Sequence, residues 1–129
     1  MWIMVPGGFV SIVEKPEDRG QDTLTVRARH VAHLVEFCGL TDFALEDSII
    51  ETESTDYPYR ITMPRGLVKR ALIVAVDELD YPNFKTRAKK VSGRGYESFL
   101  MRVWAAGLSL TSHTTERRLN LLYRAEDFS

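Results

Sequence analysis

The residues of this chain best suited to metal binding or nucleophilic chemistry are three histidines and one cysteine. His30 and His33 lie three positions apart, so both could reach one face of a helix. A metal site there would need a further ligand, such as Glu36 or Cys38. Boundary histidines and a packed thiol explain the pattern more simply, because a free cysteine on an apolar stripe usually behaves as a small hydrophobe. We therefore expect no metal site and no cofactor.

Two further patterns bear on phosphate chemistry. His113 opens a His-Thr-Thr sequence that matches the His-x-Thr unit of two-histidine phosphoesterases, but that chemistry needs two such units to supply a base and an acid. Glu51 and Glu53 share one face of an expected strand, and clustered carboxylates can hold Mg²⁺. Their spacing matches no motif, and a solvated acidic edge explains them. A small enzyme acting on a phosphate-bearing ligand is the weakest hypothesis, and we assign no catalytic residue.

The charges are unevenly distributed along the chain. The sum of 17 Lys+Arg and 18 Asp+Glu gives a net charge of −1. Six acidic and no basic residues lie between 42 and 56, whereas five basic and no acidic residues lie between 85 and 94. Basic helices beside aromatic residues can bind nucleic acid through its phosphates. The candidate contacts are Lys85, Arg87, Lys89, Lys90 and Arg94, extended by Arg27 and Arg29 on the polar face of an expected strand.

Hydrophobic periodicity predicts the elements that position these residues. A period of two or a β-branched composition predicts strands, whereas apolar residues at i, i+3, i+4 and i+7 predict helices. The expected strands are 9–15, 24–29, 48–53 and 59–63, and a break at 6–8 separates residues 2–5, which are a candidate for a further short strand. The expected helices are 31–38, 64–79, 82–91 and 96–110, with a break at 92–95.

The order β-β-α-β-β-α-α-α predicts an α+β fold. We expect an antiparallel sheet of about four strands in two hairpins, with helices packed on one face, and a ferredoxin-like arrangement is one candidate. Residues 1–110 should form one domain, and 111–129 should form a polar linker and a short tail.

Composition excludes several classes of protein. A lone cysteine cannot form an internal disulfide, which favours a reducing compartment. No apolar run approaches the roughly 20 residues of a membrane-spanning helix, so we expect no membrane partner and a cytoplasmic location.

Six segments of the chain stand out as a set: Gly8-Phe9, Glu14-Lys15-Pro16, 24–29, 56–60, 80–85 and Val103-Trp104. Together they resemble a family of short actinobacterial and actinophage (mycobacteriophage-type) proteins with no assigned activity. The resemblance covers roughly residues 1–108. It implies a phage or accessory gene that acts on a host factor, and it brings no catalytic residue.

The first hypothesis is therefore a non-enzymatic interaction or regulatory protein, with nucleic-acid binding as its alternative. A protein partner or a second copy of the chain is the expected partner, because the 67–79 helix is apolar nearly all round. The tail offers candidate interface residues that could pack on a partner. These are Leu119, Leu122, Tyr123 and Phe128.

Overall fold

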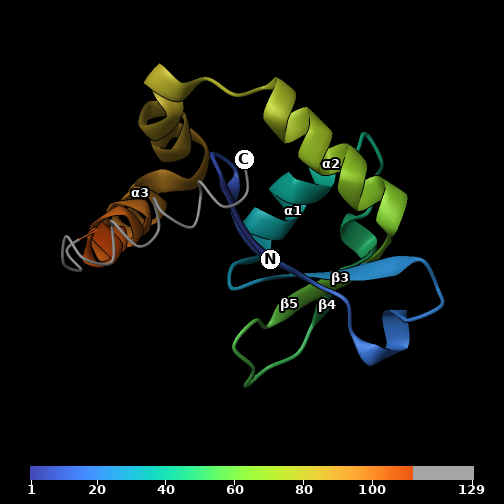
Figure 1. Cartoon of the computed structure of the whole chain (residues 1–129). Coiled ribbons are helices and arrows are strands. Elements are labelled where there is room, and N and C mark those ends of the chain that lie inside the picture. The colour runs from blue at the N-terminus through green and yellow to red at the C-terminus, as the bar shows by residue number, and fades with distance from the viewer. Residues whose placement is uncertain (112–129) are drawn as a thin grey trace, which may run out of the picture. The chain divides into compact units, whose positions relative to one another are not determined.

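The computed structural model describes residues 1–111 of the 129-residue chain. The chain divides into two compact units, Met1–Tyr96 and a second that begins at Glu97. The first unit holds an open antiparallel sheet with helices packed against it (Figure 1). The predicted α+β class is therefore confirmed.

The sheet has five strands in the order β1-β2-β3-β5-β4. The first three strands form a continuous meander, and β5 pairs with β3 along its full length. This order differs from the ferredoxin-like candidate, which has a helix between its first and second strands. The strands are β1 (Trp2–Val5), β2 (Gly8–Val13), β3 (Thr23–Ala28), β4 (Ile50–Glu51) and β5 (Tyr59–Pro64).

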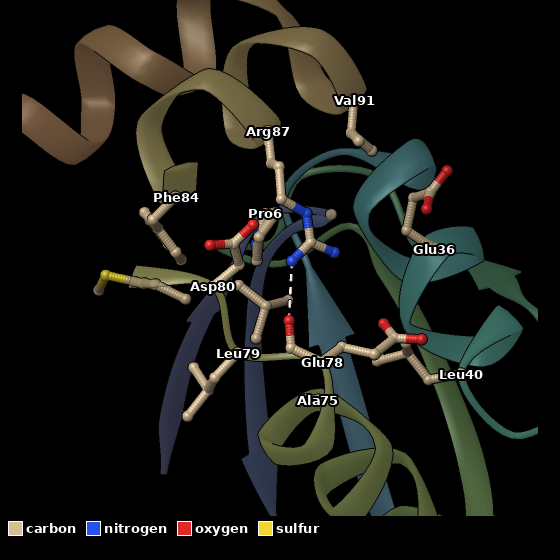
Figure 2. A pocket seen from close by; sticks show the side chains of 13 residues that line it. Pro6, Glu36, Leu40, Ala75, Glu78, Leu79, Asp80, Phe84, Arg87 and Val91 are labelled. Atoms are coloured by element: carbon tan, nitrogen blue, oxygen red, sulfur yellow. Dashed lines mark hydrogen bonds between the residues drawn. The ribbon is translucent and has the colours of Figure 1, made fainter. Parts of the chain in front are cut away.

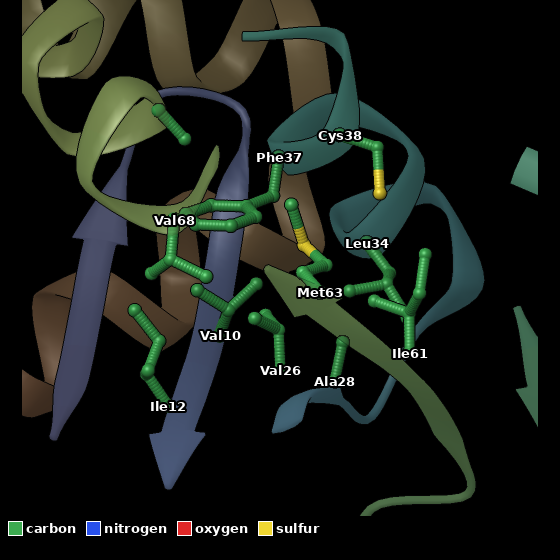
Figure 3. Close-up of a cluster of buried hydrophobic side chains, with 11 residues drawn as sticks. Val10, Ile12, Val26, Ala28, Leu34, Phe37, Cys38, Ile61, Met63 and Val68 are labelled. Atoms are coloured by element: carbon green, nitrogen blue, oxygen red, sulfur yellow. The ribbon is translucent and has the colours of Figure 1, made fainter. Parts of the chain in front are cut away.

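Two helices, α1 (Val31–Gly39) and α2 (Arg65–Asp77), lie on the same side of the sheet (Figure 1). The strand residues that alternate toward them are the apolar ones, because successive side chains of a strand point to opposite faces. Figure 3 shows how these side chains meet those of the two helices in one core. Its fully buried members include Val10, Val26, Ile61, Leu34, Phe37, Met63 and Val68.

The third helix, α3 (Phe84–Thr111), joins the two helices that the sequence separates at 92–95. The predicted break is present as a kink at Gly93, where φ is 81° and ψ is 177°. That conformation is open essentially to glycine alone. Both sides of the kink are held to the β1–β2 turn: Ser92 before it and Tyr96 after it donate hydrogen bonds to the carbonyl oxygens of Pro6 and Val5.

Two other boundaries differ from the sequence prediction. Of the expected strand 48–53 only Ile50–Glu51 forms, because a 3₁₀ turn precedes it and Ser54 adopts a positive φ of 63° after it. Pro64 ends β5 with an extended ψ of 137° instead of beginning the helix. Within residues 1–111, no helix combines the length and the apolar character needed to span a bilayer.

Candidate nucleic-acid interface

Three arginines gather on the face of the sheet that is turned away from α1 and α2. Arg27 alternates along β3 with the buried Val26 and Ala28, so it points to the opposite side. Arg29 directly follows the end of β3, and its guanidinium group lies over the same tyrosine ring as that of Arg27. Arg60 of β5 is the direct cross-strand partner of Arg27. We call Arg27, Arg29 and Arg60, with the Tyr57 ring beside them, the arginine face.

Tyr57 holds the arginine face together. The guanidinium carbon of Arg27 lies 4.5 Å from the centre of the Tyr57 ring, and that of Arg29 lies 5.2 Å from it. Such cation–π contacts stabilise a cation over an aromatic ring. Arg60 donates from Nη2 to the Tyr57 carbonyl oxygen at 3.1 Å, and Arg27 donates from Nη2 to Ser11 Oγ at 2.9 Å. These contacts fix the guanidinium groups while leaving their charges in place.

No carboxylate neutralises these arginines within residues 1–111. The ion pairs of this part of the chain join Arg65 to Glu14 and Asp22, and Arg70 to Asp42. Like charges directly opposite each other on neighbouring strands are destabilising.

Arg27 and Arg60 each also bury a hydrogen-bond donor that has no acceptor within residues 1–111. The Nε atoms of Arg27 and Arg60 are buried and find no hydrogen-bond partner within the described chain. The arginine face therefore has the electrostatics of an anion-binding surface.

An aromatic row continues the arginine face toward the edge strand. The rings of Phe9 and Tyr57 are 6.3 Å apart, and Trp2 meets Phe9 edge to face at 6.0 Å. Phe9 and Tyr57 are buried, but Trp2 remains 68% exposed. An exposed tryptophan is thus fixed on the same face as the arginines.

A groove of about 370 Å³ adjoins the arginine face on its other flank. Its polar lining includes Lys15, Thr23, Thr25 and Thr62, and Arg60 lies at its border with the arginine face. These threonines point to the same side of the sheet as Arg27 and Arg60, because they occur two or four positions away along β3 and β5.

Asp18 organises the floor of this groove. Its carboxylate accepts hydrogen bonds from Thr23 Oγ1 at 2.7 Å, from Thr25 Oγ1 at 2.8 Å and from the Lys15 backbone N–H at 2.9 Å. Burial alone would raise the pKa of Asp18, but these hydrogen bonds outweigh it and hold the pKa below its ordinary value. Asp18 therefore stays ionised and keeps the hydroxyls of Thr23 and Thr25 oriented.

The basic helix predicted from the sequence lies elsewhere. Four of its residues, Lys85, Lys89, Lys90 and Arg94, are exposed on α3, whereas Arg87 is half-buried. Figure 2 shows Arg87 pointing into a cavity of about 140 Å³ lined by parts of the β1–β2 turn, α1, α2 and α3.

Arg87 is already engaged inside this cavity. It donates from Nη1 to the Glu78 carbonyl oxygen at 2.8 Å. Phe84 and Val91, on the same face of α3, line the cavity with α1 and α2 residues. Arg27 points to the other face of the sheet, and Arg29 lies beside it over the Tyr57 ring. The structure therefore does not join Arg27 and Arg29 to the inner face of α3 as one continuous patch.

His30, His33 and Cys38 serve the fold. His33 Nδ1 accepts the Phe9 N–H at 3.3 Å, and the His33 ring packs against Tyr96 and His30. Burial and the neighbouring His30 lower the pKa of His33. Cys38 is fully buried, which raises its pKa to about 11, so it is a poor nucleophile. No group of three His, Cys, Asp or Glu side chains within residues 1–111 is arranged to hold a metal ion.

The remaining candidates are exposed or lie outside the described residues. Glu51 and Glu53 are exposed, at and after the short edge strand β4. The predicted tail interface and the His-Thr-Thr sequence lie outside the described residues 1–111. These are Leu119, Leu122, Tyr123, Phe128 and His113.

The sequence pattern indicates Arg27 and Arg29 as candidate contacts but does not indicate Arg60, Tyr57 and Trp2 as their neighbours. The alternation of Arg60 and Thr62 with buried residues of β5 marks a polar strand face. It does not reveal that β5 pairs with β3 in the register that opposes two arginines. No family model, no curated protein and no solved structure matches this chain.

Proposed function

We propose that this protein binds nucleic acid and that the arginine face is its phosphate-binding surface. The observation that carries the proposal is the cross-strand pair Arg27–Arg60, which no carboxylate neutralises within the described chain. A phosphate backbone supplies regularly spaced anions that would relieve this repulsion.

The chemistry of the side chains suits that ligand. A guanidinium group presents several N–H donors in a planar fork that matches the oxygen atoms of a phosphate. One Nη2 bond to Ser11 or to the Tyr57 carbonyl orients each of Arg27 and Arg60 and leaves further donors. Arg29 is exposed and has its charge at the same face.

The test is charge reversal at the exposed member of the arginine face. We expect Arg29→Glu to weaken binding of a labelled oligonucleotide at low salt at least tenfold, measured by fluorescence anisotropy. Lys69→Glu makes the same charge change on the exposed surface of α2 and should alter the affinity less than about twofold, in keeping with a rim charge.

The same assay separates the two basic clusters of the chain. The double variant Lys85→Glu, Lys89→Glu removes the exposed helical charges that the sequence singles out. If this variant loses binding while Arg29→Glu keeps it, the α3 segment is the binding surface and our assignment is wrong. Absence of binding by the unmodified protein, to DNA and to RNA alike, would exclude the function altogether.

Self-association through the second unit is a second candidate function. Met101, Trp104 and Leu108 are spaced at i, i+3 and i+7, the a-d-a spacing of paired helices. All three are exposed, Trp104 by 65%. A second copy of α3 would bury this stripe, and exposed tryptophans are frequent anchors of protein interfaces.

Light scattering at increasing protein concentration tests self-association. We expect a dimer that Trp104→Ala shifts toward monomer, because the substitution removes the largest side chain of the stripe. Leu110→Ala is the matched control, since Leu110 is more exposed (78%) but lies on the opposite side of the helix by its spacing. A monomer at every concentration would rule out this second candidate.

A further inference from the structure

An exposed aromatic ring lies on the same side of the sheet as the arginine face. Trp2, Ser11, Arg27, Arg60 and Ile50 form one row across the five strands. Paired residues in such a row point to the same side of the sheet, so the exposed Trp2 ring shares its face with the two opposed arginines.

Trp2 has the properties of a stacking platform. Its edge-to-face contact with the buried Phe9 restrains the ring, while about two thirds of the side chain is left to solvent. Aromatic side chains beside a basic surface hold unpaired bases by stacking, whichever base is presented. A base inside a duplex already stacks on its neighbours and cannot reach such a ring.

The groove on the other flank suits a base or a sugar better than a phosphate. It contains the Asp18 and Glu17 carboxylates, which would repel a phosphate. The Thr23 and Thr25 hydroxyls donate to Asp18, so their oxygen atoms remain as acceptors for the N–H groups of a base. Its volume of about 370 Å³ falls within the usual range of ligand pockets, roughly 300–1,000 Å³.

We propose that the arginine face selects single-stranded nucleic acid. Its phosphates follow Arg27, Arg29 and Arg60, one base stacks on Trp2, and another enters the groove beside Asp18. This inference rests on the proposed nucleic-acid binding and adds the strandedness of the ligand and the positions of two bases. Unpaired bases can splay away from their backbone, which the two separate base positions require.

The experiment compares a single-stranded oligonucleotide with the duplex of the same sequence as competitors in the anisotropy assay. We expect the single strand to compete at least tenfold better than the duplex, with DNA and RNA arms tested separately. Trp2→Ala should weaken single-strand binding about tenfold, the usual scale of one lost stacking contact, and Trp2→Phe should restore part of it.

Two further measurements locate the bases. In a Trp104→Phe background Trp2 is the remaining tryptophan, and we expect its fluorescence to be quenched when the single strand binds. Thr62→Tyr places a ring at the groove from an exposed position and should weaken binding severalfold. Thermal unfolding of each variant checks that the fold is retained.

The outcomes separate this inference from the proposed function. If duplex and single strand compete equally, or if Trp2→Ala or Thr62→Tyr leaves affinity unchanged, the single-strand inference is wrong. Should Arg29→Glu still weaken binding at least tenfold in that case, the proposed function stands without the single-strand inference. If the protein binds neither form, both are wrong.

Discussion

At the residue scale, the buried polar groups of this protein differ in whether their hydrogen-bonding capacity is satisfied. Asp18 is buried and receives three hydrogen bonds, whereas Arg27 and Arg60 bury Nε atoms that find no partner in residues 1–111. An unsatisfied buried donor typically costs about 1–3 kcal/mol. The hydrogen bonds to Asp18 therefore stabilise the fold, whereas the unpaired Nε atoms of Arg27 and Arg60 reduce its stability.

Asp18→Asn tests how much the hydrogen bonds to the Asp18 carboxylate stabilise the fold. The amide keeps the shape but loses the charge and places a donor where acceptors are needed, so we expect a loss of about 2 kcal/mol in the free energy of unfolding. Urea denaturation at neutral pH measures it. Asp22→Asn is the control, because Asp22 is exposed with φ at 55°, a conformation that asparagine tolerates.

The Asp18 carboxylate should also make the stability of the protein depend on pH, with a loss of stability in acid. Because its folded pKa is depressed, its stabilisation is complete above the unfolded pKa of about 3.9 and is lost as pH falls through the folded value. The native protein should lose this contribution in acid, and Asp18→Asn should flatten that part of the pH profile. Identical acid profiles for the two proteins would contradict this account of Asp18.

Gly8→Ala tests a close approach of two elements. Gly8 has a φ of +144°, and a Cβ there would lie 2.3 Å from His33 Cγ. We expect a loss of roughly 2–3 kcal/mol, since the variant combines a disfavoured backbone with overpacking. Gly66→Ala in α2 is the control, because a Cβ at Gly66 would have no neighbouring atom within contact distance. This variant should leave the urea midpoint unchanged or raise it.

At the element scale, α3 shows how a single residue divides a helix. The kink at Gly93 lies beside Ser92, whose hydroxyl reaches the Pro6 carbonyl. Tyr96 follows one turn later, and its hydroxyl reaches the Val5 carbonyl at 2.7 Å. Burial also raises the pKa of Tyr96 far above its ordinary value, so the phenol remains a donor at neutral pH. The kinked segment is therefore fastened to the β1–β2 turn on both sides of Gly93.

Gly93→Ala should destabilise the kinked backbone at this position. Alanine disfavours the kinked backbone by about 1–3 kcal/mol and favours continuous helix. We expect a lower melting temperature with equal or greater helical circular dichroism. Gly95→Ala, where φ is not positive, should raise helicity without that destabilisation. A Gly93→Ala variant as stable as the native chain would show that the kink is not required by the fold.

At the scale of the whole molecule, the two faces of the sheet have separate roles. One face is covered by α1 and α2 and forms the hydrophobic core (Figure 3). The other presents the arginine face, Trp2 and the groove beside Asp18. Near-neutral net charge thus coexists with a locally basic surface, because the acidic residues 42–56 fall mainly in the loops and edge that surround β4.

Cys38 reports on the integrity of the whole core. It is fully buried with a pKa of about 11, so a thiol reagent at pH 8 should modify it only when the core opens. We expect labelling far slower than in the urea-unfolded chain. Val68→Ala, which removes a buried core contact, should accelerate labelling roughly 30-fold if it costs about 2 kcal/mol. Rapid labelling of the native protein would contradict the packing described here.

Much of the local structure followed from the sequence alone. The alternation in 24–29 and 59–63, the apolar spacing of 31–38 and the glycine break at 92–95 all predicted elements that the structure contains. These features are local, because they depend on the period of burial and on backbone freedom. The limits of β4 were harder to predict, because the turns on either side end this edge strand, whereas its composition would allow a longer one.

The sequence by itself determined the fold class, the amphipathic elements and the presence of arginines on a polar strand face. Only the tertiary structure decided which residues meet across strands. It set Arg27 against Arg60, placed Tyr57 over two guanidinium groups, brought Trp2 to the same face and turned Arg87 inward. Cross-strand register depends on contacts between residues far apart in the chain, and a one-residue shift would turn every side chain to the other face. The candidate site is therefore a property of the pairing of β3 with β5.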